Sequence, residues 1–259
     1  MLSRQEKRLN RIIKMLHLSN PTTVNNLSSI MDVSHMTIRR DLELLKERKL
    51  VDIFHGGVIL NNEKKRAKQH PYSLSFANKQ MNPEKKLIAV KASSYIKSND
   101  IIILDTGSTM EYFARALPDC FPFTVICFTL NSLVHVSKMD QAEIIFPGGY
   151  FHENTLMFES KEGIELIKEN PADTAFISAS GISLEAGVSC SNDYEFATKT
   201  EMIKSADKKI LLVDSSKFNK VKSTPFAELT DFDVIISDKG IPEEYRDYCN
   251  TQNIELILV

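Results

Sequence analysis

Short apolar runs rich in β-branched residues alternate with stretches of helical periodicity from residue 87 to the end of the chain. This alternation predicts right-handed βαβ units, which assemble into a mostly parallel sheet with helices on both faces. The predicted strands are residues 101–105, 124–127, 143–146, 174–178, 209–213, 234–237 and 254–259. The predicted helices between them are residues 87–96, 110–117, 131–137 and 194–206.

The loop after the strand at residues 101–105 has the composition of an anion-binding site. It reads Thr106-Gly107-Ser108-Thr109 and runs directly into a helix. Backbone N–H groups converge at a helix N-terminus, the helix dipole favours negative charge there, and hydroxyl groups add hydrogen bonds. The structural alternative is an ordinary helix cap, because Ser and Thr cap helices in many proteins.

Polar or glycine-bearing residues follow several other predicted strands. Ligands of such sheets bind beyond the carboxyl ends of the strands, so these loops should meet at one edge. We interpret Asp105 and Asp214 as acceptors for sugar hydroxyls, and Lys199 and Lys217 either as phosphate partners or as ordinary surface lysines. The loops together predict a pocket for a small phosphorylated sugar. Besides residues 106–109, the candidate pocket residues are Asp105, Asn131, Ser132, Gly148, Gly149, Lys199, Asp214 and Lys217.

The first 60 residues have a different organisation. Helical periodicity covers residues 3–18 and 24–31, and a third helix follows Ser34 after a tight turn. Residues 50–54 and 58–60 flank the turn His55-Gly56-Gly57 and predict a β-hairpin. Three helices followed by a hairpin predict a winged helix-turn-helix, with the third helix reading DNA.

The third helix has one apolar face, formed by Ile38, Leu42 and Leu45. Arg40 and Met36 point the opposite way. Arginine can hydrogen-bond guanine bidentately or pair with phosphates, and threonine can contact a thymine methyl. A solvated amphipathic helix is the alternative for an Arg-Arg pair taken alone. The candidate DNA-binding residues are Ser34, Met36, Thr37, Arg39, Arg40 and His55.

Charge is distributed as this interpretation requires. Residues 1–60 contain ten Lys and Arg against six Asp and Glu, whereas the rest of the chain contains 22 against 28. A basic N-terminal domain followed by an acidic second domain is expected when only the first domain contacts phosphates. Residues 61–86 are polar and hold seven Lys and Arg. We interpret them as a solvated linker, with extra phosphate contacts by Lys64, Lys65 and Arg66 as an alternative.

Other site classes find little support in the sequence. The four cysteines form no CxxC pair, and the six histidines show no metal-ligand spacing, so neither a zinc site nor a disulfide framework is predicted. We predict no cofactor. No apolar run is long enough for a membrane helix, and the N-terminus does not have the pattern of a signal peptide. These features lead us to expect a cytoplasmic protein without a membrane partner.

The N-terminal motif resembles that of a known family. Thr37-Ile38-Arg39-Arg40-Asp41-Leu42, followed by His55-Gly56-Gly57, is similar to the signature of the DeoR family of bacterial repressors. The resemblance continues through residues 104–109, the Gly148-Gly149 pair and residues 213–218. It implies a winged helix-turn-helix at residues 1–60, a linker at 61–86 and a sugar-phosphate effector domain at 87–259. That effector domain would be similar in fold to ribose-5-phosphate isomerase and glucosamine-6-phosphate deaminase.

Several stretches are most similar to the deoxyribose branch of the family, which implies deoxyribose 5-phosphate or a close relative as inducer. Ser178 stands where the common family pattern has glycine, and the serine form fits this branch. The stretches are residues 122–132, 148–158, 173–183, 189–192 and 251–254.

Two other functions stay open. A sugar-phosphate isomerase or deaminase needs a base near C1 or C2 of the sugar and usually a second acid. Residues 173–178 lack the carboxylate pair of the isomerases, so we expect no enzyme activity and assign no catalytic residue. The second domain could instead only oligomerise the protein. We favour a repressor whose oligomer spans operator half-sites on double-stranded DNA and whose operator affinity falls when a phosphorylated sugar binds.

Overall fold

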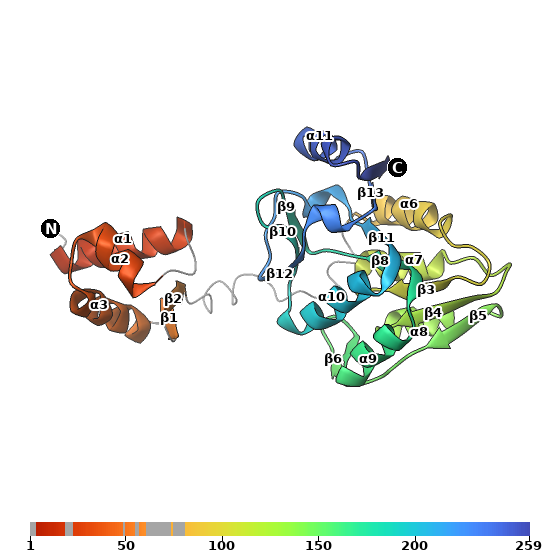
Figure 1. The fold of residues 1–259 in the computed structure, drawn as a ribbon, viewed down its shortest axis with the longest axis horizontal. Helices are drawn as coiled ribbons and strands as arrows, with labels where there is room; N and C mark the ends of the chain where they lie inside the picture. The colour runs from red at the N-terminus through yellow and green to blue at the C-terminus, as the bar shows by residue number, and fades with distance from the viewer. Residues whose placement is uncertain (1–3, 19–22, 49, 55–56, 61–73, 75–80) are drawn as a thin grey trace. The chain divides into compact units, whose positions relative to one another are not determined.

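The computed structural model describes the chain except for residues 1–3, 19–22, 49, 55–56, 61–73 and 75–80 (Figure 1). The chain forms two compact units, Met1–Pro71 and Tyr72–Val259. We call them the head and the sensor unit and describe each by itself. Among the described residues, no helix is both long and apolar enough to cross a membrane.

The head contains α1 (Arg4–Leu18), α2 (Val24–Met31), α3 (His35–Glu47) and the antiparallel hairpin β1 (Val51–Phe54) and β2 (Gly57–Leu60). This order confirms the predicted winged helix-turn-helix. His55, predicted to contact DNA, and Ser3, the predicted cap of the first helix, lie outside the described residues. The head has its own core, made of Leu9, Ile12, Leu16, Leu27, Ile38, Leu42, Leu45, Val51 and Val58.

Local capping explains how α2 and α3 are separated. Thr23 accepts a hydrogen bond from the Asn26 N–H at 3.1 Å, and Ser34 accepts one from the Thr37 N–H at 3.2 Å. Asp32, between the two helices, has a φ of 52°, a left-handed conformation that Asp tolerates better than most residues. The turn therefore ends α2 and starts α3 within a few residues.

The sensor unit is built on a seven-stranded sheet in the order β14-β13-β11-β8-β3-β4-β5, in which all neighbouring strands are parallel. Each of the seven predicted strands is a strand of this sheet, with ends shifted by up to three residues. The strands are β3 (Ile101–Leu104), β4 (Phe123–Cys127), β5 (Ala142–Ile145), β8 (Ala172–Ile177), β11 (Ala206–Leu212), β13 (Val234–Ser237) and β14 (Glu255–Leu258).

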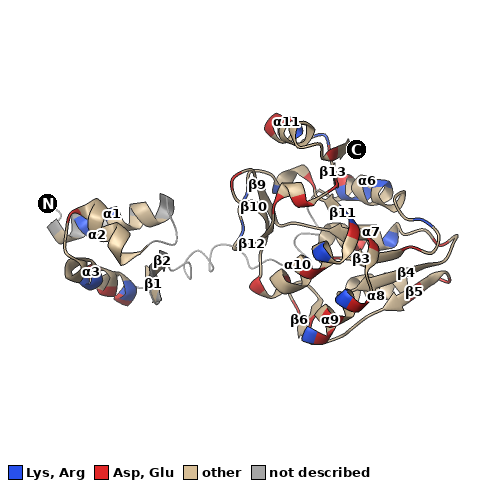
Figure 2. Cartoon of the chain, viewed as in Figure 1, with Lys and Arg blue, Asp and Glu red and all other residues tan. Residues whose placement is uncertain are grey.

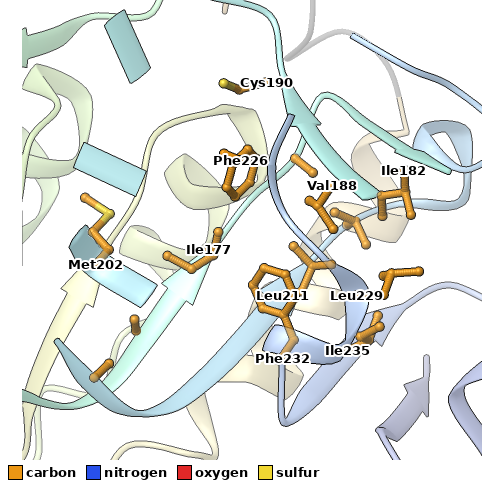
Figure 3. Packing of buried hydrophobic residues seen from close by; sticks show 14 of the residues in the cluster. Ile177, Ile182, Val188, Cys190, Met202, Leu211, Phe226, Leu229, Phe232 and Ile235 are labelled. Atoms are coloured by element: carbon orange, nitrogen blue, oxygen red, sulfur yellow. The ribbon is translucent and has the colours of Figure 1, made fainter. Parts of the chain in front are cut away.

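Helices cover both faces of the sheet. Consecutive residues of β3 face opposite sides, so Ile102 and Ile103 belong to different hydrophobic clusters. Figure 3 shows the cluster that contains Ile177, Leu211 and Ile235. The helices on that face are α9 (Lys161–Glu169), α10 (Phe196–Lys204) and α11 (Glu243–Thr251), and those on the other face are α6 (Asn82–Ser93), α7 (Ser108–Arg115) and α8 (Leu130–Val136).

Two small antiparallel sheets, which the sequence analysis did not anticipate, flank the main sheet. One is formed by β12 (Thr224–Ala227), β10 (Gly187–Cys190) and β9 (Gly181–Ser183), and the other by β6 (Tyr150–His152) and β7 (Met157–Glu159). The predicted linker over residues 61–86 also ends earlier than expected, because α6 begins at Asn82. Pro83 in its first turn favours a helix start there.

Candidate effector site and nucleic-acid interface

A recess lies where the chain leaves the carboxyl ends of β3, β8 and β11, which are neighbours in the sheet. This edge is where ligands of parallel α/β sheets bind. Four of the residues that line it come from the predicted loop at 106–109, and Lys217 was also predicted. The lining residues are Thr106, Gly107, Ser108, Thr109, Ser178, Ala179, Ser180, Glu195 and Lys217.

The first turn of α7 opens on this recess. Gly107 is the N-cap residue and has a φ of 107°, a conformation that favours glycine. Since glycine has no side chain, no side-chain cap occupies the N–H groups of the first turn. Ser108 and Thr109 line the recess with exposed fractions of 5% each. The arrangement offers N–H donors and hydroxyl groups to an anion at the positive end of the helix dipole.

Lys199 lies beneath the recess and does not face it. Its ammonium pairs with the Asp105 carboxylate and donates to the Ser178 carbonyl at 3.1 Å. Burial by itself lowers the pKa of Lys199, but the Asp105 and Glu195 carboxylates outweigh burial and raise this pKa above its ordinary value. The prediction that Lys199 meets the phosphate therefore finds no support in its position, because the lysine already neutralises Asp105.

Asp105 is the centre of a buried polar cluster. Its Oδ2 accepts from the Ser178 N–H at 2.8 Å and from the Ser178 hydroxyl at 3.1 Å. The same hydroxyl contacts the Thr106 carbonyl at 2.6 Å. The other oxygen of Asp105, Oδ1, is buried without a hydrogen-bond partner among the described residues. The cluster fixes the backbone at the start of loop 106–109 and leaves one carboxylate oxygen available.

Glu195, which the sequence analysis did not single out, places a carboxylate in the recess. Its Oε2 accepts from the Thr106 hydroxyl at 3.0 Å and lies 3.8 Å from the Lys199 ammonium. Its Oε1 accepts from the Asn192 amide at 2.7 Å. Burial raises the pKa of Glu195, and the nearby Lys199 and the two hydrogen bonds only partly offset this rise. Sequence reasoning could not assign Glu195 to the site, because single Glu residues are common at helix starts. Its position beside Thr106 in the folded chain makes the assignment.

Asp214 lies close to two lysines at the end of β11. Its Oδ2 is 4.0 Å from the ammonium of Lys217, which lines the recess, and 4.0 Å from that of Lys85 on α6. The side chains of Asp214 and Lys85 are fully buried. Burial lowers the pKa of Lys85 to about 8, although Asp214 acts in the opposite direction. Lys85 is the second functional candidate that sequence reasoning missed, because its position in the predicted linker suggested solvent exposure.

Seven of the twelve predicted pocket residues are not among those that line the recess: Asp105, Lys199 and Asp214, which lie close to lining residues, and Asn131, Ser132, Gly148 and Gly149. Asn131 donates to Glu111 at 3.3 Å, and Ser132 is fully buried and accepts from Thr129 at 2.9 Å. Gly148 and Gly149 shape the approach to β6. A Cβ at Gly149 would lie 2.3 Å from the Glu159 carbonyl oxygen. The positions of Asn131, Ser132 and the two glycines outside the recess lining give no support to a role of these four residues in ligand binding.

On the head, α3 presents polar side chains to solvent. Arg39 and Arg40 are exposed, as are Ser34 and Met36, while Thr37 is half-buried. In Figure 2, both basic and acidic residues, coloured blue and red, occur along this helix. Five of the six predicted DNA-contacting residues therefore lie on the outer side of α3 or at its start.

Asp41, in the same helix, is buried and points toward α1. It accepts a hydrogen bond from Arg8 Nη2 at 3.0 Å and one from Gln5 Nε2 at 3.4 Å, and Arg8 Nε also pairs with it. The carboxylate of Asp41 is thus engaged by α1 and does not neutralise Arg39 or Arg40 from within the core. Its contacts fix α3 against α1.

The chain belongs to the DeoR family. Residues 80–239 match the DeoR C terminal sensor domain, and residues 8–64 match the DeoR-like helix-turn-helix domain. Over 257 residues it is 29% identical to the deoxyribose operon repressor of Escherichia coli strain K12, which covers 99% of this chain and 100% of the relative.

Other relatives of similar identity differ in what their names describe. The L-fucose operon activator of Haemophilus influenzae is 30% identical and covers 95% of this chain and 97% of its own length. The transcriptional regulator GolR of Listeria innocua is 32% identical, with 91% of both chains covered. Each of these relatives is named as a regulator of transcription or of an operon.

Solved structures match parts of the chain. Ribose 5-phosphate isomerase A from Methanocaldococcus jannaschii has a TM-score of 0.39 and 18% identity and covers 52% of this chain and 53% of its own. A probable sor operon regulator from Shigella flexneri has a TM-score of 0.45 and 9% identity and covers 63% and 88%.

Proposed function

We propose that this protein is a transcriptional repressor of a sugar or deoxyribonucleoside catabolic operon. In this proposal a phosphorylated sugar, deoxyribose 5-phosphate by preference, binds the recess and releases the protein from its operator. The full-length similarity to the deoxyribose operon repressor supports this choice of sugar. The protein acts as a homo-oligomer whose heads bind spaced half-sites on double-stranded DNA.

The observation that carries the effector proposal is the uncapped first turn of α7 in the recess, with Lys217 beside it. Backbone N–H groups, the Ser108 and Thr109 hydroxyls and one ammonium suit a phosphate. The buried oxygens Oδ1 of Asp105 and Oδ2 of Asp214 lack hydrogen-bond partners among the described residues and suit sugar hydroxyls. Asp105 adjoins Thr106 in the chain, and Asp214 lies 4.0 Å from Lys217.

Discrimination of deoxyribose from ribose calls for an apolar wall beside C2 of the sugar, for which we consider Phe128, Leu130 and Met157. Phe128 and Met157 belong to the hydrophobic core, whereas Leu130 is 39% exposed. None of the three lines the recess. We therefore base the preference for the deoxy sugar on the family branch and not on an apolar wall.

We propose that the protein has no catalytic turnover. An isomerase would need a carboxylate free to move a proton between carbon atoms. Asp105 is held by Lys199 and Ser178, and Glu195 by Thr106 and Asn192. Both carboxylates are thus engaged in positioning the recess. The relatives are named as regulators, in keeping with this assignment.

Calorimetry with deoxyribose 5-phosphate, ribose 5-phosphate and free deoxyribose tests the proposal. A charge-assisted hydrogen bond contributes about 1.5–3 kcal/mol, against about 0.5–1.5 kcal/mol for a neutral one. Several such bonds to one phosphate should favour deoxyribose 5-phosphate over deoxyribose by at least about tenfold, which needs only about 1.4 kcal/mol. Equal affinities for the two would contradict phosphate binding at α7.

A further inference from the structure

We propose that Asn154 and Asn192 couple the effector recess to Leu74, near the start of the sensor unit. The inference rests on the proposed function and specifies how that site is regulated. The two asparagines are positioning residues, since neither of them lines the recess. They would determine how strongly a bound sugar phosphate changes operator affinity.

A continuous series of hydrogen bonds begins in the recess. The Thr106 hydroxyl donates to Glu195 Oε2 at 3.0 Å, and the Asn192 amide donates to Glu195 Oε1 at 2.7 Å. Asn154 Nδ2 donates in turn to Asn192 Oδ1 at 3.2 Å. The series therefore connects the phosphate-binding loop to the turn between β6 and β7.

The same turn holds Leu74, near the start of the sensor unit. The N–H of Leu74 donates to the carbonyl of Asn154 at 3.0 Å, and the Leu74 side chain is buried, with an exposed fraction of 4%. Leu74 belongs to the sensor unit, which begins at Tyr72, and so lies just after the head in the chain. Asn154 thus contacts the start of the sensor unit through its backbone and the recess network through its side chain.

Asn154 is held in place by a second group of contacts. The Tyr194 hydroxyl donates to Asn154 Oδ1 at 2.8 Å and lies 3.0 Å from the Thr155 hydroxyl. The Tyr194 ring stacks on His152, with centroids 3.5 Å apart and an angle of 8° between the planes. The His152 Nε2 lies 2.7 Å from Glu159 Oε2. Such contacts leave the Asn154 amide little rotational freedom, so a displacement of Asn192 is transmitted to the turn.

Binding of an anion supplies the displacement. Thr106 and Glu195 both line the recess, and a phosphate there would compete with Glu195 for the Thr106 hydroxyl. Repulsion between the phosphate and the Glu195 carboxylate acts in the same direction. The Glu195 carboxylate would then lose the hydrogen bond from Thr106 and keep the one from Asn192, whose side chain also accepts a hydrogen bond from Asn154. A ligand shifts a conformational equilibrium only through different interactions with its two states, and this change of partner is such a difference.

The test compares full-length wild-type protein with Asn154→Ala and with the control Asn170→Ala. Asn170 also uses its amide within the sensor unit, donating to the Leu166 carbonyl at 2.8 Å, but takes no part in the recess series. Three quantities are measured for each protein. They are the affinity for deoxyribose 5-phosphate, the operator affinity, and the factor by which the sugar phosphate lowers operator affinity.

We expect Asn154→Ala to keep both separate affinities within about threefold of wild type and to reduce the factor at least about fivefold, the lower end of typical allosteric coupling. Asn170→Ala should keep the factor. Tyr194→Phe, which retains the two asparagines but removes the hydroxyl that holds Asn154, serves as a second variant if Asn154→Ala does not fold, and should also reduce the factor.

An unchanged factor in both Asn154→Ala and Tyr194→Phe, with wild-type protein released normally, would overturn this inference alone. Wild-type protein that no sugar phosphate releases from the operator would overturn the proposed function and, with it, the coupling.

Discussion

The ammonium of Lys199 lies against the carboxylate of Asp105 in the interior of the sensor unit, and both side chains are almost completely buried. The pair connects α10 with the end of β3, where the loop that lines the recess begins. In the DeoR-family sensor unit described here, this internal ion pair supports the recess from below. It also explains why the Lys199 ammonium is not available to a ligand.

Breaking this pair should destabilise the sensor unit. Lys199→Met leaves the Asp105 charge buried without its counter-ion, which costs about 3–5 kcal/mol in comparable buried pairs. The double variant Asp105→Asn/Lys199→Met should lose less than the sum of the single variants, because neither charge is left alone. Urea unfolding measures the loss of stability in the single variants and in the double variant. Lys168→Met, at an exposed pair with Glu165, is the control and should change little. A Lys199→Met protein as stable as this control would contradict the role of the pair.

The contact between Arg8 and Asp41 should stabilise the head in a similar way. Among the contacts of the described residues, Arg8→Ala leaves the buried Asp41 with the long hydrogen bond from Gln5, and we expect a loss of about 3 kcal/mol in the unfolding free energy of the head. Arg11→Ala, at an exposed position of the same helix, is the control. Loss of helical circular dichroism on heating reports the difference. Equal melting temperatures for the two variants would show that Asp41 does not need Arg8.

Arg40 should contact the operator. Arg40→Ala is expected to weaken operator binding by about 1–3 kcal/mol and to relax the preference at one base pair if the guanidinium contacts a base. Lys46→Ala, in the last turn of the same helix, provides the matched loss of one positive charge. Fluorescence anisotropy with operator variants measures both effects. Unchanged binding of both Arg39→Ala and Arg40→Ala would refute α3 as the reading helix.

Lys85 should make stability depend on pH in the alkaline range. Its pKa is about 8 in the folded protein, against an ordinary value of 10.5. Between these values the unfolded chain binds more protons, so the wild type gains stability as pH rises, by at most about 1.4 kcal/mol per pH unit from this group. Lys85→Met lacks this gain.

The unfolding free energies of wild type and Lys85→Met are measured at pH 7 and pH 9.5. The value for wild type minus the value for Lys85→Met should be larger at pH 9.5 than at pH 7. Lys86→Met removes the same charge from the exposed neighbouring position and is the reference. If this value, wild type minus Lys85→Met, is the same at both pH values or smaller at pH 9.5, the lowered pKa of Lys85 is contradicted.

Much of the fold could be predicted because it depends on periodicity. The seven parallel strands are buried apolar runs, and such runs stand out in a sequence. The short strands β6, β7, β9, β10 and β12 could not be predicted. They have three or four residues each, and their formation depends on contacts with distant elements, as in the pairing of Met157 with Thr129.

The part of the site that consecutive residues form could be predicted from the sequence. The part that the fold assembles from distant segments could not. Loop 106–109 was recognisable because a strand, small hydroxyl residues and a helix follow one another. Glu195 and Lys85 were missed since each reaches the site from a distant segment. Lys199 was assigned to the phosphate because the sequence could not show that Asp105 already occupies its ammonium.

The most direct test of the central claim is a titration of the protein–operator complex with deoxyribose 5-phosphate, for wild type and for Thr109→Glu. The glutamate places a negative charge at the first turn of α7, where we expect the phosphate, while Thr230→Glu adds the same charge at an exposed position. The account predicts that wild type and Thr230→Glu release the operator, whereas Thr109→Glu folds, binds the operator and is not released. Release of Thr109→Glu at the same sugar-phosphate concentration as wild type would contradict it.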